Sequence, residues 1–501
     1  MRQPTAAFNA GAIARKRDVE TRLDYGFLKR FFLFFGVALL VFCPFTLDPI
    51  AFAVGGFFPW LMMLIIGRPN MPSAVVYLVL WQWAQTFARA IETIPDGESL
   101  AGGLFGPNVA RAYWYMLASV LVIALCMRLC LGNLKAPTEQ DRRWHTRWQP
   151  RDLVIVYVFT LGLSFFARFA GGISGALDQP MQALLHLKIL ALFLLFTNVL
   201  MTGVGGRYLM VVFLFETITG FTGILSDFKA VFLQLALAAL AARIRWTFTM
   251  GIASLVWVVV LVTLGIFWSG VKAEFRQMAT GSEESQAISA SLSDRLGYLG
   301  NRALNPSSIN WNEASYALLI RFAYVDIFGS VITVQEATPE PAFMRQWSEG
   351  LGHVLQPRFL FPNKAPLSDT EVYVRLAKGD PTEEIRQGTS ISVGYMGENF
   401  ADLGFPGMLA GIGVLGLLAG GIYRYFMTRK IPWMVREGTI LVLVYSVARD
   451  GVEISLPKLL GALLMVTGVF FFLVRYGYPR VLQWLNRPPK RRANAIRRGR
   501  A

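Results

Sequence analysis

The sequence is poor in charged residues, histidine and cysteine, and each shortage excludes a class of protein. Only 16% of the 501 residues are charged and 54% are hydrophobic, so a soluble fold could not bury all the continuous apolar segments. Three scattered histidines and three cysteines within apolar runs form neither a metal site nor a disulfide framework. A P-loop, an Asp-x-Asp pair and a Gly-x-Ser-x-Gly motif are also missing. We therefore predict a membrane protein that uses no nucleotide, metal or other cofactor.

Apolar runs recur along the chain at about the length that crosses a bilayer, roughly 20 residues for a helix. Only helices and closed barrels span membranes, and the alternating pattern of barrel strands is absent. We predict an all-α polytopic integral membrane protein with about twelve transmembrane helices. The expected spans are 27–47, 49–66, 73–90, 109–131, 152–170, 184–203, 208–226, 228–242, 247–268, 404–426, 438–455 and 457–475.

The connections between these spans differ in charge. The basic ones are "RKRDVETR", "KAPTEQDRRWHTRWQPR", "RIRW", "TRKIPWMVREG" and "KRRANAIRRGR". All fall on one side of the membrane if both termini are cytoplasmic, as the positive-inside rule requires. The net charge of +16 is thus mainly a topology signal, and the basic tail is better explained by anionic lipid than by nucleic acid.

This topology divides the chain into four parts. Residues 1–268 form a cytoplasmic N-terminus and nine spans, and 269–403 form one large periplasmic loop with more acidic than basic residues. Residues 404–478 hold three further spans, and 479–501 form a basic cytoplasmic tail.

One stretch of the loop, "SYALLIRFAYVDIFGSVI" at 315–332, is nearly long enough to cross the membrane. One helical face of it carries Leu318, Phe322, Val325, Gly329 and Ile332. We interpret the stretch as one interfacial or loop-packed helix, because a crossing would move the basic tail to the outside.

Several cations lie at the expected outer ends of spans, where positive charge is disfavoured: Arg89, Arg111, Arg168, His186, Lys188, Lys229, Arg449 and Lys458. Each alone is explained by an ion pair or by snorkelling, for example Arg89 with Glu92, Lys229 with Asp227, and Arg449 with Glu453. As a set they suit an anionic ligand such as a polyprenyl pyrophosphate, which cations stabilise more strongly as it leaves. The substrate-binding candidates are Arg168, Lys229, Arg321 and Arg449.

Acidic residues also interrupt two spans. Glu216 lies in the middle of the seventh span, where it either faces a polar cavity or pairs with a neighbouring helix. Arg449, Asp450 and Glu453 interrupt the eleventh span. Gly451 and the nearby Pro457 indicate a broken helix end that lines a cavity.

The loop segment "QPRFLFPNKAP", 356–366, holds two cations between three prolines. Proline fixes φ and removes a donor, so the segment is expected to be extended and stiff. We predict an arm that presents Arg358 and Lys364 to a pyrophosphate or to the sugar beside it.

The order of these features resembles the bacterial O-antigen and exopolysaccharide repeat-unit polymerases. That family combines many spans, one large late periplasmic loop, a "PR-x-hydrophobic-x-P-x-K-P"-like segment and a later "G-E-x-x-x-x-x-G-x-x-G" run. The matching residues are Pro357, Arg358, Pro362, Lys364, Pro366, Gly397, Glu398, Gly404 and Gly407, and "GILSDFK" before the eighth span is also similar. Ala365, between Lys364 and Pro366, departs from the pattern.

The resemblance implies a GT-C-like, metal-independent glycosyltransferase on the periplasmic face of the bacterial inner membrane. It would transfer a growing glycan from undecaprenyl pyrophosphate to a sugar hydroxyl of a new lipid-linked repeat. The expected catalytic residues are Arg358 and Lys364 as phosphate ligands, and Glu398 and Asp450 as carboxylates that assist the acceptor. Glu398 has an alternative role at a helix N-terminus or in loop packing. The implied partners are membrane lipids, a chain-length-regulating co-polymerase and a flippase, and no nucleic acid.

Two other functions remain open. An O-antigen ligase would share the architecture but transfer finished glycan to lipid A. A polysaccharide-lipid flippase or other transporter is a different class, in which about twelve spans are common but a loop as long as 269–403 is not required.

Overall fold

The computed structural model describes residues 23–102, 106–139, 141, 147–173, 178–222, 228–244, 247–280, 289–339, 343–356, 360–361, 364, 368–377, 391–448 and 451–487. Within helices it leaves out the side chains of 168–173, 178–180, 182 and 448. Every regular element in the described residues is a helix, which confirms the predicted all-α class for that part of the chain.

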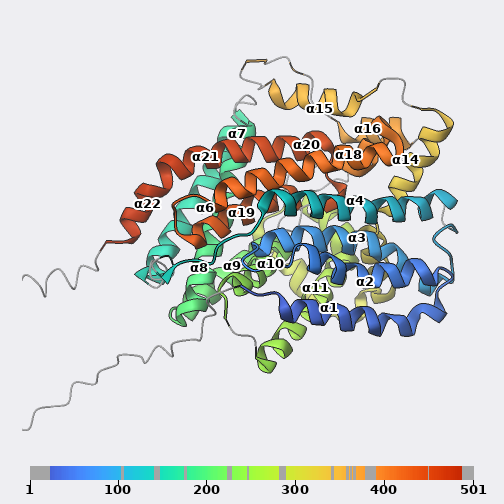
Figure 1. The fold of residues 1–501 in the computed structure, drawn as a ribbon. Coiled ribbons are helices and arrows are strands. Elements are labelled where there is room, and N and C mark those ends of the chain that lie inside the picture. The colour runs from blue at the N-terminus through green and yellow to red at the C-terminus, as the bar shows by residue number, and fades with distance from the viewer. Residues whose placement is uncertain are drawn as a thin grey trace, which may run out of the picture.

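The helices form an elongated bundle with shorter helices packed at one end (Figure 1). The first group is α1 (Gly26–Leu39), α2 (Pro49–Ile65), α3 (Ser73–Asp96), α4 (Pro107–Leu131), α6 (Pro150–Ile173), α7 (Asp178–Leu185), α8 (Leu187–Thr202), α9 (Gly206–Thr222), α10 (Phe228–Ala241) and α11 (Phe248–Thr280). The predicted loop holds α12 (Leu292–Leu304), α13 (Trp311–Phe322), α14 (Val325–Ala337), α15 (Arg345–Leu355) and α16 (Asp369–Ala377). The last group is α18 (Gly394–Met427), α19 (Trp433–Ala448), α20 (Leu456–Gly461), α21 (Thr467–Phe472) and α22 (Tyr478–Leu485).

The chain is a polytopic membrane protein. Among the described residues, seven helices are long and apolar enough to cross a membrane, or up to eight if the bent pair α13–α14 is one span. The seven are 26–45, 107–131, 150–167, 183–202, 248–280, 394–427 and 456–485. The other predicted spans coincide with α2, α3, α9, α10 and α19, so the number twelve stays a prediction.

Small residues allow a close contact between α18 and α4. A Cβ added at Gly416 would lie 3.2 Å from the Cα of Ile123, and one at Gly420 would lie 2.9 Å from the Cα of Met127. Glycines on one face of a membrane helix allow such an approach of two backbones. This packing explains why the glycine-rich "GIGVLGLLAGG" run is a helix despite the low helix propensity of glycine.

The connections that we predicted to be cytoplasmic lie together at one end of the bundle. Asn70, between α2 and α3, donates its backbone N–H to Leu23 before α1 and its side-chain amide to Leu134 after α4. Arg243, after α10, donates to Asn70 at 2.9 Å and lies over the ring of Trp433 at the start of α19. Which side of the membrane this end faces stays a prediction from the positive-inside rule.

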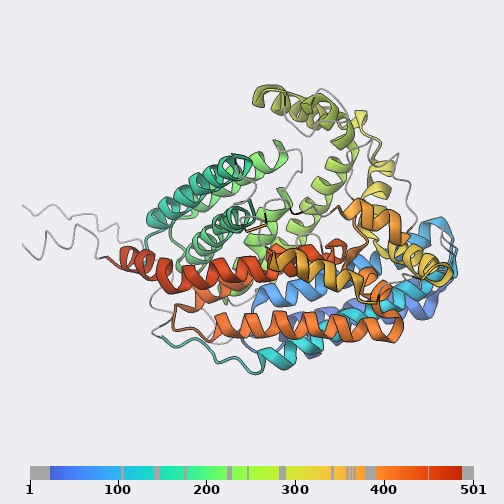
Figure 2. The same cartoon turned by 90° about the horizontal axis from the view of Figure 1, so that it is seen from above.

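The other end of the bundle holds the remaining connections and the helices of 269–403. Leu100, between α3 and α4, donates its N–H to Asp48 before α2. Tyr316 of α13 donates to Asp96 at the end of α3 at 3.2 Å, and α14 packs along α4. Figure 2 shows α11 and α12 on the opposite side of the bundle from α18.

The stretch 315–332 differs from the single helix that we predicted. Ala323 and Tyr324 are not helical, and they separate α13 from α14 by a bend of 49°. The single helical face is therefore divided: Val325, Gly329 and others of α14 are buried against the bundle, whereas α13 packs against α11 and α3 and stays more exposed.

Candidate functional site

Four cations from three helices converge at the end of the bundle that carries the loop helices. Lys229 is in the first turn of α10, Lys272 and Arg276 are on α11, and Arg321 is in the last turn of α13. The Lys272 ammonium lies within electrostatic range of Arg321, Arg276 and Lys229. Lys229 and Arg321 are exposed, and the two α11 cations are half-buried. We call these four residues the cation cluster.

The sequence places these cations by helical periodicity. Lys272 and Arg276 are four residues apart and so share one face of α11. Val271 and Phe275 point away from that face into a small core with Leu299 of α12. α13 packs along α11 and brings Arg321 to the same place.

Within the described part of the chain, no salt bridge joins Lys272, Arg276 or Arg321 to a carboxylate. The Nε of Arg276 is buried and has no hydrogen-bond partner among the described residues. Lys272, Arg276 and Arg321 repel one another, and a polyanion removes this repulsion. Guanidinium groups bind phosphate oxygens bidentately and ammonium groups bind them as point charges, so this cluster has the chemistry of a phosphate or pyrophosphate site.

An aromatic group lies directly next to the cluster. The ring of Phe228, which precedes Lys229, stacks on Phe221 at a centroid distance of 4.0 Å. Phe221 also contacts Trp268, one helical turn before Lys272. The pairing of cations with an aromatic, apolar surface suits a ligand with an anionic head and a hydrocarbon tail.

Most of the other predicted outer cations are held in ion pairs. Arg89 is buried and pairs with Glu92 at 3.1 Å, as predicted, and with Asp326 of α14 at 3.5 Å. Lys458 pairs with Asp369 of α16, which also accepts a hydrogen bond from Ser455. For these residues the structure favours the individual explanation by ion pairing over a shared ligand. A further pair of this kind joins Arg111 to Glu336.

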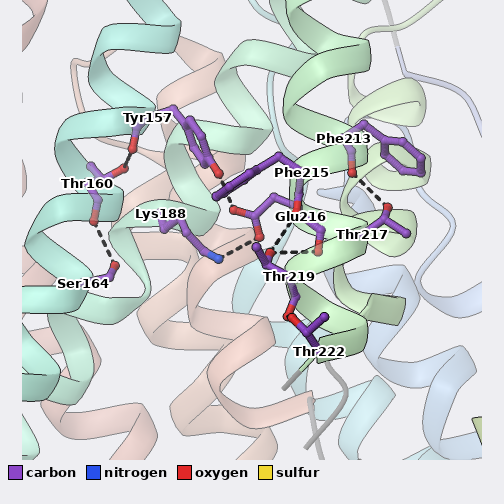
Figure 3. A network of polar contacts seen from close by, with 10 residues as sticks. All are labelled: Tyr157, Thr160, Ser164, Lys188, Phe213, Phe215, Glu216, Thr217, Thr219 and Thr222. Atoms are coloured by element: carbon purple, nitrogen blue, oxygen red, sulfur yellow. Dashed lines mark hydrogen bonds and ion pairs between the residues drawn. The ribbon is translucent and has the colours of Figure 1, made fainter. Parts of the chain in front are cut away.

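Glu216 in the seventh predicted span connects three helices (Figure 3). It accepts a hydrogen bond from the Tyr157 hydroxyl of α6 at 2.5 Å and pairs with Lys188 of α8 at 2.7 Å. Its side chain is 9% exposed, so both partners compensate the cost of burying the carboxylate. Of our two explanations for Glu216, the structure favours the pair that joins neighbouring helices.

The proline-bracketed segment is only partly described, and Arg358 lies outside the described residues. Lys364 donates to the carbonyl oxygens of His353 and Gln356, the latter at 2.8 Å, at the end of α15. A cation there satisfies carbonyls that have no partner within the helix and interacts favourably with its dipole. Lys364 therefore interacts with the C-terminal end of α15, a role that we did not predict.

Glu398 lies in the first part of α18 and is 1% exposed. Its Oε2 accepts the backbone N–H of Leu456 at 2.7 Å, at the start of α20. This is the helix N-terminal role that we had considered as the alternative to catalysis. One neighbour has a similar role, because Asp402 accepts the N–H groups of Gln346 and Trp347 at the start of α15.

The predicted break in the eleventh span is present. α19 ends at Ala448, a turn follows at 451–453, and α20 begins at Leu456. Arg449 and Asp450 themselves lie outside the described residues, as does the side chain of Arg168 in α6.

Among the predicted site residues whose side chains the structure describes, only Lys229 and Arg321 come together. It adds Lys272 and Arg276, which we missed because we ended the ninth span at 268 and considered only cations at span ends. Their spacing of four residues directly after an apolar run was the available signal.

Comparison of the chain with protein-family models, with curated proteins and with solved structures finds no match.

Proposed function

We propose that this protein is a membrane glycosyltransferase that polymerises undecaprenyl-pyrophosphate-linked oligosaccharide repeat units into O-antigen or exopolysaccharide. The observation that carries the proposal is the cation cluster, which lies where apolar helices meet the polar loop helices. A lipid-linked pyrophosphate would place its phosphates on the cations and its isoprenoid chain along the adjacent aromatic surface. The resemblance of the sequence to the polymerase family supports the same donor.

In this proposal the cluster stabilises the charge that develops on the leaving group. As the bond between the sugar and the pyrophosphate breaks, negative charge accumulates on the phosphate oxygens, and preorganised cations bind that charge more strongly than the ground state. Lys272 and Arg276 are on one helix and Arg321 on another, so the three approach the diphosphate from different directions. The reaction is GT-C-like and is placed on the periplasmic face of the bacterial inner membrane.

The test uses the purified full-length protein in lipid nanodiscs, supplied with undecaprenyl-pyrophosphate-linked repeat units. We expect a ladder of polymer, and we expect Lys272→Met together with Arg276→Met to lower its rate by at least about a hundredfold, a typical loss for groups that stabilise developing charge. Arg302→Met is the matched control, because Arg302 is a cation of the adjacent α12 that pairs with Glu274 on another face of α11.

A polymer ladder of wild-type rate from the double variant would overturn the role of the cluster. Addition of lipid A as acceptor distinguishes a ligase from a polymerase, since a ligase would transfer glycan to lipid A and form no ladder. A flippase would move the lipid-linked repeat across the bilayer and leave its length unchanged.

A further inference from the structure

The end of α15 and the residues that follow it carry large apolar side chains on an exposed surface. Leu351 is 37% exposed and Leu355 is 68% exposed. After the helix, Leu360 is 64% exposed and Phe361 is 46% exposed. All four belong to 269–403, which we predicted to be a periplasmic loop surrounded by water. A group of exposed apolar side chains outside the spans indicates a surface that contacts a membrane or a protein.

The exposed surface of α15 is divided into an apolar flank and a polar flank. Leu351 and Leu355 are four residues apart, about one helical turn, and form the apolar flank. Arg345 and Glu349, which are joined by an ion pair at 2.7 Å, share the polar flank with Gln356. A helix with this division suits the boundary between lipid and water.

The buried face of α15 packs along α20, the first part of the 456–485 span (Figure 1). A Cβ added at Gly350 would lie 3.4 Å from the Cγ of Pro457, and one added at Gly461 would lie 3.7 Å from the Cγ2 of Val354. The two helices therefore run in the same direction, and Val354 reaches the level of Gly461. That glycine is five residues inside the span, or about 7.5 Å at the rise of an α-helix. Interfacial helices bury their apolar face to about this depth.

The carbonyl groups at the end of α15 have a partner within the protein. Lys364 donates its ammonium group to the carbonyl oxygens of His353 and Gln356, the latter at 2.8 Å. Its backbone N–H donates to the carbonyl of Phe361 at 3.2 Å, which keeps Phe361 close to the last turn of the helix. Carbonyls at a helix end have no partner within the helix, and hydrocarbon offers none. A helix that ends at lipid therefore needs such a donor.

From these observations we infer that the apolar flank of α15, together with Leu360 and Phe361, is inserted into the phospholipid leaflet next to the loop helices. Among lipid, a second copy of the chain and another protein, lipid fits best. Acyl chains already surround the 456–485 span, and α15 lies directly against the first turns of that span. The inference goes beyond the proposed function, since it holds whatever reaction the protein catalyses.

The first test places the photoreactive amino acid p-benzoylphenylalanine at single positions of the full-length protein in phospholipid nanodiscs. Its benzophenone reacts on illumination with C–H bonds within its reach and forms no product with water. We expect the variant Leu355→p-benzoylphenylalanine to gain the mass of one phospholipid. The matched control is Glu349→p-benzoylphenylalanine, because Glu349 is exposed on the polar flank of the same helix and should gain little or none.

The mass of the product identifies what covers the apolar flank. A doubled protein mass would show a second copy of the chain, and a cross-link within one chain would show another segment of the same protein. Absence of any product would show water, and equal lipid yields at Leu355 and Glu349 would show that lipid does not prefer the apolar flank. Each of these four results overturns the inference. The melting temperature of each variant checks that it is folded.

The second test is the double variant Leu351→Gln/Leu355→Gln, measured by hydrogen exchange of the α15 amides in nanodiscs. We expect exchange to become faster by about tenfold or more, the factor that corresponds to removing a leucine side chain from an apolar environment. The matched control is Glu349→Gln, which removes only an exposed ion pair and should leave the exchange unchanged. Unchanged exchange in the double variant would mean that the two leucines face water, and it would overturn the inference.

Discussion

At the scale of single residues, the partner of a charged side chain decides its role, and position in the sequence alone does not. Lys458 and Lys272 are both cations near the predicted outer end of a span, where positive charge is disfavoured. Lys458 has a carboxylate of α16 beside it and so attaches a loop helix to the bundle. Lys272 has other cations beside it and so is available to an anionic ligand.

Lys364 provides a prediction of this kind. Lys364→Met should remove the donor to the last carbonyls of α15 and destabilise its end by about 1 kcal/mol, while the methionine keeps the apolar stem. Hydrogen exchange of the amides of α15 measures this change, and polymerisation should persist. If Lys364→Met instead abolished polymerisation without faster hydrogen exchange in α15, this result would support the catalytic role that we predicted from the sequence.

Glu216 provides a second one. Lys188→Met and Glu216→Gln should each lower the melting temperature of the protein in nanodiscs. Each variant removes one partner of the pair and leaves the other without its main electrostatic compensation. A buried charge left unpaired costs about 3–5 kcal/mol of stability. The combined variant Lys188→Met/Glu216→Gln should be less destabilised than the sum of the two single variants. Strict additivity would show that the two side chains do not act as a pair.

At the scale of elements, apolar periodicity predicted the membrane helices well and the loop helices poorly. Every predicted span coincides with a described helix, because a membrane helix is selected by hydrophobicity and length. α15 and α16 were not predicted, because their ends are stabilised by contacts distant in sequence, such as Asp402 at the start of α15. The bend at Ala323 and Tyr324 was missed as well, because it lies within a continuous apolar stretch.

The contact between α18 and α4 leads to a prediction with a built-in control. Gly420→Leu should prevent this close packing, since a Cβ there would lie 2.9 Å from the Cα of Met127. A Cβ at the neighbouring Gly421 would meet nothing within 4 Å, so Gly421→Leu should be tolerated. The yield of monodisperse protein and its melting temperature distinguish the two variants, and equal behaviour would contradict the packing described above.

At the scale of the whole molecule, the two groups of connections at opposite ends of the bundle predict the topology. Reporter fusions at Thr138 and Arg429 should have cytoplasmic activity, and a fusion at Asn305 should have periplasmic activity, because the basic connections share one end. A cytoplasmic result at Asn305 would mean that an even number of spans precedes α12, and the cation cluster would then face the wrong side for a periplasmic reaction.

The first turns of α18 have a consequence for how the molecule unfolds. Within 394–403, Asp402 holds α15, Glu398 holds the start of α20, and Tyr395 bonds to Gln82 of α3 and to Ile454. Loop and bundle thus share one set of hydrogen bonds and form a single cooperative unit. The 269–403 segment expressed alone should therefore show little stable helix by circular dichroism. In the intact protein, the amide hydrogens of α15 should exchange as slowly as those of α18. The loop looks like a separate domain in the sequence, but it cannot open without loosening the membrane helices next to it.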